Sequence, residues 1–104
     1  SDCEVEEFQL SSDPEDLGTI NGASLADLQL GRRSGALVLA IRNPADGLSN
    51  PFRDEPKPSL LANPGGHVRL GPGQLLVVMG SKEQLSRFAE LLGRALVDVG
   101  VMAG

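Results

Sequence analysis

A chain of 104 residues with a net charge of −5 has the size of one small domain, so a single modest hydrophobic core is expected. Apolar residues make up 40% of the chain and charged residues 22%, which is typical of a folded domain and unlike a disordered one. The negative charge argues against broad contact with a nucleic-acid backbone, because that affinity comes from Lys and Arg. We therefore predict one domain over residues 1–104, with its core at about 4–99, and no nucleic-acid partner.

The cysteine content and the hydropathy pattern bear on the cellular compartment. Cys3 is the only cysteine, so it cannot form an internal disulfide or a thiol metal cluster. No apolar run approaches the roughly 18 residues of a membrane span. The acidic start of the chain is unlike a secretory signal. These features predict an intracellular domain whose connection to a membrane lies outside this stretch of sequence.

The first half of the chain predicts a strand, a short helix and a second strand. Residues 4–10 alternate enough to place their apolar side chains on one face, which is typical of a strand with one wet side. Ser24 begins a capping-box spacing that predicts a helix of about two turns. Residues 31–35 indicate a polar turn, and the apolar run 36–41 predicts a central strand buried on both faces.

The second half begins with a proline-rich segment and ends with a helix. Residues 43–62 contain several prolines and no periodic apolar pattern, so we expect a long loop that is mobile or only locally ordered. Residues 67–70 and 74–79 predict two strands of a hairpin. Ser81 starts a second capping-box spacing, followed by apolar residues at helical spacing as far as Val99.

This order of elements predicts the fold class. Strand, helix, three strands and helix correspond to an α+β domain in which a small mixed or antiparallel sheet carries two helices on one face. The other face of the sheet is left uncovered, and an uncovered apolar face favours a symmetric dimer.

No group of residues points to catalysis. The single histidine, His67, has no nucleophile elbow or other supporting motif, so we expect no enzyme. The acidic residues among the first sixteen positions match no calcium-loop spacing and favour a solvated edge. Arg32, Arg33 and Arg42 flank the central strand, where a guanidinium can bind a phosphate or simply face solvent.

A resemblance to a known family lies in three blocks of the chain, namely GASLADLQL from Gly22, RRSGALVLAIR from Arg32 and NPGGHVRLGPGQLLVVMG from Asn63. They resemble the C-terminal RCK domain, also called TrkA-C. Two features depart from that pattern. Residues 43–62 stand as an insertion where the family has a tight turn, and Gln74 stands where the family often has Asp.

The resemblance implies a homodimeric, ligand-sensing regulatory domain that gates a potassium channel or transporter. It would work at the cytoplasmic face of a membrane, attached to an RCK N-terminal Rossmann-like domain. Some relatives bind cyclic di-AMP at the two-fold interface, so this or another nucleotide is the implied ligand, with no metal. By position, the cleft would be lined by Ile41, Arg42, Asn63, Pro64 and His67. The alternatives are a module that only dimerises and a regulatory domain of a transporter for another ion or an anion.

Overall fold

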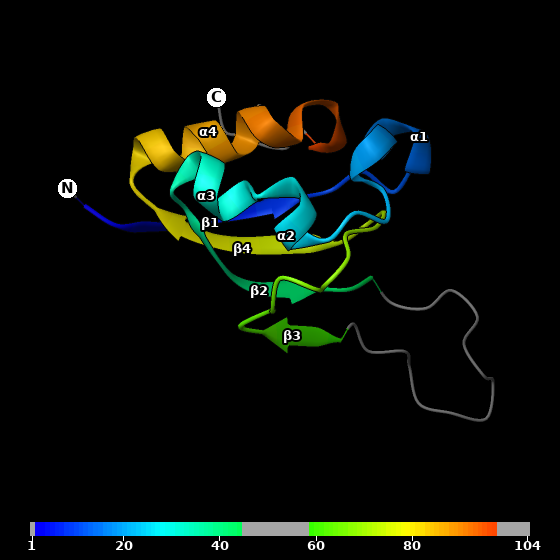
Figure 1. Cartoon of the computed structure of the whole chain (residues 1–104), viewed down its shortest axis with the longest axis horizontal. Coiled ribbons are helices and arrows are strands. Elements are labelled where there is room, and N and C mark those ends of the chain that lie inside the picture. The colour runs from blue at the N-terminus through cyan, green and yellow to red at the C-terminus, as the bar shows by residue number, and fades with distance from the viewer. Residues whose placement is uncertain (1, 45–58, 98–104) are drawn as a thin grey trace.

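A computed structural model describes residues 2–44 and 59–97 of the chain. Four antiparallel strands form one sheet in the order β1-β4-β2-β3, and the helices lie on one side of it (Figure 1). The strands are β1 (Glu4–Gln9), β2 (Leu37–Arg42), β3 (Leu60–Ala62) and β4 (Leu75–Gly80). The helices are α1 (Pro14–Leu17), α2 (Leu25–Leu28), α3 (Leu30–Ser34) and α4 (Lys82–Leu92), with short 3-10 turns at Gly18–Ile20 and Gly93–Ala95. The predicted α+β class with helices on one face is confirmed.

Helix α4 forms where its capping signal predicted. The Ser81 hydroxyl accepts from the Gln84 backbone N–H at 3.2 Å, while the Gln84 side chain accepts from the Ser81 N–H at 2.9 Å. This reciprocal pair satisfies two backbone donors that the first turn would otherwise leave unpaired. The helix ends at Leu92, before the predicted end near Val99, because Gly93 takes a left-handed φ of 52° and stops it.

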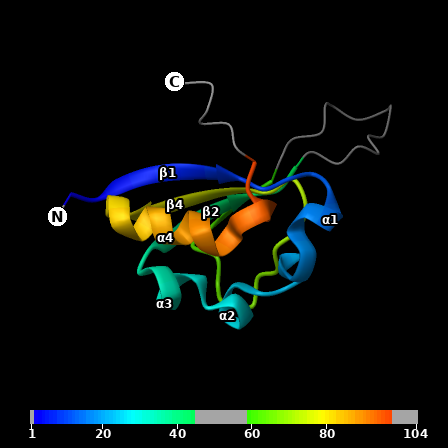
Figure 2. The same cartoon turned by 90° about the horizontal axis from the view of Figure 1, so that it is seen from above.

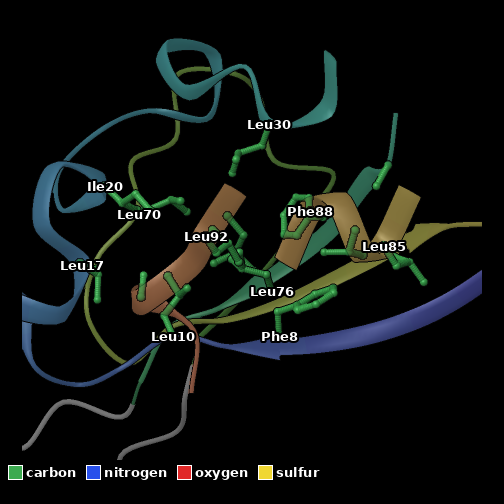
Figure 3. Close-up of a cluster of buried hydrophobic side chains, with 14 residues drawn as sticks. Phe8, Leu10, Leu17, Ile20, Leu30, Leu70, Leu76, Leu85, Phe88 and Leu92 are labelled. Atoms are coloured by element: carbon green, nitrogen blue, oxygen red, sulfur yellow. The ribbon is translucent and has the colours of Figure 1, made fainter. Parts of the chain in front are cut away.

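The hydrophobic core lies between α4 and the helix-facing side of β1 and β4 (Figure 3). Leu76 and Val78 of β4 are completely buried, and their neighbours in sequence point to the other face. The Phe8 ring of β1 meets the Phe88 ring of α4, with 5.2 Å between ring centroids. Seen from the helix side, α4 lies over β1 and β4, whereas α2 and α3 lie toward β2 (Figure 2).

The predicted strand at 67–70 does not join the sheet. Its backbone runs beside the entry to α2 instead: the Gly22 N–H donates to the Leu70 carbonyl at 2.8 Å, and the Leu70 N–H donates to the Ala23 carbonyl at 2.9 Å. Strand β4 therefore has β1 and β2 as its neighbours. The fourth strand is β3, which lies inside the predicted loop 43–62 and corrects that prediction for its last residues. The rest of the predicted loop, at 45–58, lies outside the described residues.

Two local predictions around β2 are also corrected. The expected turn at 31–35 is largely helix α3, whose last residue Ser34 donates its hydroxyl to the Leu30 carbonyl at 2.6 Å and accepts from the Ala36 N–H at 3.0 Å. Strand β2 is not buried on both faces, because none of the described helices covers the far side of the sheet, and Leu37 is 55% exposed. Within the described residues, no helix is long and apolar enough to cross a bilayer.

Candidate ligand pocket

A pocket of about 400 Å³ opens on the helix-bearing side of the sheet, where α2 and α3 approach the start of β2. This volume lies in the range of small-molecule sites. Most of its lining is apolar or small, and its polar side chains are those of Gln29 and Arg32. The remaining lining residues are Leu25, Ala26, Leu30, Gly31, Ala36, Leu37, Val38, Pro64 and Gly66.

The wall opposite α3 is fixed to α2 by backbone hydrogen bonds. The N–H groups of Leu25 and Ala26 in the first turn of α2 donate to the carbonyls of Val68, at 3.0 Å, and Gly66, at 2.9 Å. A side chain at position 66 would place its Cβ 3.0 Å from the Cβ of Ala26, so this close approach favours glycine. The segment that carries Pro64 is thereby held against the helix.

Two residues beside the pocket have a left-handed backbone. Gln29, between α2 and α3, has φ 51°, and Asn63, before Pro64, has φ 49°. Among the described residues these are the only positions other than glycine with positive φ. Such conformations cost free energy and tend to occur at ligand sites, where the surroundings hold them in place.

Arg32 gives this pocket its charge. Its side chain is exposed and contributes to the lining. Within the described residues the one ion pair joins Arg94 to Asp16, so no described carboxylate neutralises Arg32. An apolar hollow beside a cationic group suits a ligand with a flat apolar part and an anionic group.

The five residues predicted to line a ligand cleft occupy different places. Pro64 lies in the pocket wall, and Asn63 precedes it and donates its N–H to the Leu39 carbonyl at 2.8 Å. Ile41 is 1% exposed and packs in the core. Arg42 is exposed at the far end of β2 and His67 is exposed on the loop, and neither lines this pocket.

A buried amide organises the region around the end of β2. Gln74 is 7% exposed, and its Nε2 donates to Asn43 Oδ1 at 2.9 Å while its Oε1 accepts from the Gly71 N–H at 2.9 Å. Asn43 Nδ2 in turn donates to Ser59 Oγ at 3.1 Å. Gln74, the departure from the family pattern, thus connects the turn before β4 to Asn43 and, through Asn43, to Ser59.

The sequence signals for the pocket-lining residues are few. Arg32 is one of three arginines that the sequence leaves open between phosphate binding and a solvated surface, and Gln29 was not predicted because glutamine gives no signal for a left-handed backbone. Leu28 and Leu30 are only two positions apart, a spacing that does not fit one face of a continuous helix, and α2 and α3 are indeed separated between them. Among the described residues, no group of three His, Cys, Asp or Glu side chains is placed to hold a metal ion.

Comparisons with known proteins place this geometry in a structural class. No protein-family model and no curated protein matches the chain by sequence. Solved structures do match, beginning with the RCK_C domain dimer of S. agalactiae BusR in complex with c-di-AMP: identity is 18%, the TM-score is 0.57, and the match covers 85% of this chain and 93% of that one. The RCK C domain of the potassium transport protein KtrA, also in complex with c-di-AMP, matches at 19% identity and a TM-score of 0.58, covering 86% and 82%.

A whole channel matches over a small part of its length. The GsuK channel bound to NAD has 21% identity and a TM-score of 0.57, and the match covers 86% of this chain but 13% of the channel chain. BusR also matches in complex with its busA-promotor DNA, at 20% identity and a TM-score of 0.59, covering 86% and 37%. These likenesses establish the fold: the chain has the fold of an RCK C-terminal domain.

Proposed function

We propose that this chain is a ligand-sensing regulatory domain that gates ion transport, with potassium as the first candidate ion, from the cytoplasmic face of a membrane. The observation that carries the proposal is the apolar pocket between α2, α3 and β2, with Arg32 in its lining and Pro64 in its wall. Support also comes from the shared fold of KtrA and BusR domains, which were solved with c-di-AMP, and of the GsuK channel. These neighbours are regulatory domains, which agrees with a role other than catalysis.

The proposed ligand is a nucleotide, with cyclic di-AMP as the first to test. A base would pack against the apolar lining that includes Leu25 and Pro64, and a phosphate would meet Arg32. The cleft predicted from the sequence, between two copies, is a second candidate position. There Arg42 and His67 would meet the phosphates or ribose, beside Asn63 and Pro64. In that arrangement buried Ile41 would fix the strand that carries Arg42 and would not touch the ligand.

The proposed assembly is a homodimer attached to an RCK N-terminal Rossmann-like domain and, through it, to a channel or carrier. BusR shows that a protein containing such a domain can bind DNA. The net charge of −5 on the present chain argues against direct contact between this domain and DNA. A nucleic-acid partner would therefore bind through another part of such a protein.

Calorimetric titration of the chain with cyclic di-AMP tests the proposal. Replacing the arginine that meets the phosphate removes a charge-assisted hydrogen bond of about 1.5–3 kcal/mol, so affinity should fall roughly ten- to a hundredfold. Arg32→Ala should weaken binding if the pocket holds the nucleotide, and Arg42→Ala if the cleft does. Arg33→Ala is the matched control, since this arginine is also exposed on α3 and does not line the pocket. No heat and no thermal shift with millimolar nucleotide would leave the chain as a module that only dimerises.

The transported ion is tested separately in the full-length protein. Flux of potassium, sodium and chloride through the complete transport system, with and without the nucleotide, measures which ion this domain regulates. We expect potassium flux to change on nucleotide addition. A change confined to another ion would assign the domain to a different transporter class while leaving its sensing role intact.

A further inference from the structure

We propose that the outer edge of strand β1 binds an extended, positively charged segment of a partner protein, which adds to the sheet as an antiparallel strand. Strand β1 is the outermost strand of the sheet, and α4 runs along it (Figure 2). This surface is separate from the proposed nucleotide pocket, which lies beside α2, α3 and β2. The backbone of β1, a hollow beside it and the charges around that hollow all favour this kind of partner.

Backbone groups of β1 point outward at alternate residues. At one end the outer edge already bonds to an extended segment, because residues 95–97 run antiparallel to it and the Val97 N–H donates to the Gln9 carbonyl at 2.8 Å. Since successive residues of a strand direct their backbone groups to opposite sides, Val5 and Glu7 point outward as Gln9 does. No described residue pairs with Val5 or Glu7 on that side. Their N–H and carbonyl groups are therefore open to a further strand.

A hollow of about 320 Å³ follows this edge on the helix-bearing side of the sheet. Its lining combines the buried Leu85 and half-buried Ala89 of α4 with the exposed carboxylates of Glu4 and Glu6 in β1. Lysine and arginine side chains suit such a surface, because they bury an apolar stem and keep the charged head in water. The remaining lining residues are Lys82 and Ser86.

The charge around the hollow is negative. A second hollow continues from it, since both are lined by Glu4 and Lys82, and this one adds Asp2 and Glu83. Together with Glu6, the carboxylates outnumber Lys82, the one cation of this lining. The only ion pair among the described residues lies elsewhere, so no described cation neutralises these carboxylates. Two β1 strands side by side would bring glutamates together, whereas a cationic strand is attracted.

The geometry of strand addition specifies the pattern of the partner. Phe8 packs in the core, so Glu4 and Glu6 point to the helix-bearing side as it does. Val5 points to the other face and is 59% exposed. In an antiparallel strand centred on Val5, the residues opposite the two glutamates have Cα atoms about 4.5 Å away. Cations at those two positions would pair with the glutamates, and an apolar residue between them would cover Val5.

Fluorescence anisotropy with a labelled synthetic peptide that alternates lysine and valine tests this pattern. A peptide of the same composition, with its lysines in one block, carries the same charge and is the control. We expect the alternating peptide to bind at least about threefold more tightly, because its cations all project to one face. N-methylation of its valines should weaken binding about tenfold, since the donors to the β1 edge are lost.

Val5→Pro separates strand addition from simple attraction between charges. Because the Val5 N–H points outward, proline removes a donor at the free edge and leaves the ladder between β1 and β4 in place. Binding of the alternating peptide should weaken about tenfold, with an unchanged circular dichroism spectrum. Val5→Ala keeps the N–H and is the matched control, with affinity within about threefold of the native chain. If Val5→Pro does not fold, the N-methylated peptide gives the same test on the native chain.

The contribution of charge is measured with a double substitution. Glu4→Gln combined with Glu6→Gln removes two cross-strand pairs, so affinity should fall at least about threefold. Glu15→Gln combined with Asp27→Asn removes the same charge from exposed positions outside both hollows, and it should leave affinity within about twofold.

Three results would overturn the β1 docking surface. They are equal binding of the two peptides, full affinity after loss of the outward donor on either side, and no binding of the alternating peptide at millimolar concentration. None of these measurements involves a nucleotide, so the ligand-sensing role is tested independently.

Discussion

The half of the sheet under α4 and the half formed by β2 and β3 differ in how their apolar residues are used. Under α4, Leu76, Val78 and Phe88 are completely buried. In the other half, Leu37 and Leu60 are more than half exposed, although they are as apolar as the core residues. The first half contains these completely buried side chains, whereas the second contributes Ile41 to the core and otherwise leaves apolar side chains exposed. Substitutions should therefore have large effects on folding at the buried positions under α4 and small ones at exposed positions such as Leu37 and Leu60.

The largest effect is expected for Phe88→Ala. Phe88 is completely buried and its ring contacts Phe8, so truncation removes an aromatic pair and leaves a cavity. The free energy of unfolding should fall by about 3–5 kcal/mol, measured by urea denaturation. Arg87→Ala, on the exposed face of the same helix, is the control and should change stability by less than about 0.5 kcal/mol. Equal losses for the two variants would mean that α4 does not form the core as described.

A smaller loss of stability is expected for the substitution Gln74→Met. Gln74→Met keeps a similar side-chain volume but removes the hydrogen bonds to Asn43 and to the Gly71 N–H. Because these polar partners would lose their hydrogen bonds in a largely buried place, the free energy of unfolding should fall by about 1–3 kcal/mol. Hydrogen exchange at the Gly71 amide provides a local measurement, because this proton should exchange faster in the variant.

Asn43→Ala is the matched comparison for that substitution. It removes the bonds to Gln74 and Ser59 but leaves the Gly71 contact in place, so it should cost less than Gln74→Met. If Asn43→Ala proves the more destabilising of the two, the amide of Gln74 is not the centre of this network.

The same division explains how far the sequence predicts the structure. Signals carried by neighbouring residues located most elements: Ser24 and Ser81 cap α2 and α4, and β1, β2 and β4 form within one residue of their expected bounds. Helix α2 is shorter than the expected two turns, because it ends at Leu28 before the left-handed Gln29. These signals depend on local hydrogen bonds and on side-chain alternation.

Predictions failed where contacts distant in sequence decide the structure. Residues 67–70 have the composition of a strand, yet their backbone groups bond to the entry of α2. Leu60 to Ala62 are too few to show a period among prolines, and they become β3 because β2 offers an open edge. The pocket depends on the same distant contacts, so that Pro64 was predicted as part of a site while the role of Gln29 was not.

The smallest effect on stability is expected for Gln29→Gly, which should stabilise the domain and not destabilise it. A left-handed backbone costs a residue with a side chain roughly 1–2 kcal/mol, and glycine avoids this cost while losing some entropy on folding. Gln29→Gly should therefore raise the free energy of unfolding by about 0.5–1 kcal/mol. Asp27→Gly is the control: Asp27 lies two residues earlier in regular helix α2, where glycine should destabilise by a similar amount. Thermal unfolding of both variants measures the contrast. A destabilised Gln29→Gly would mean that the side chain of Gln29 contributes more to the pocket wall than its backbone costs, and nucleotide affinity should then fall in the same variant.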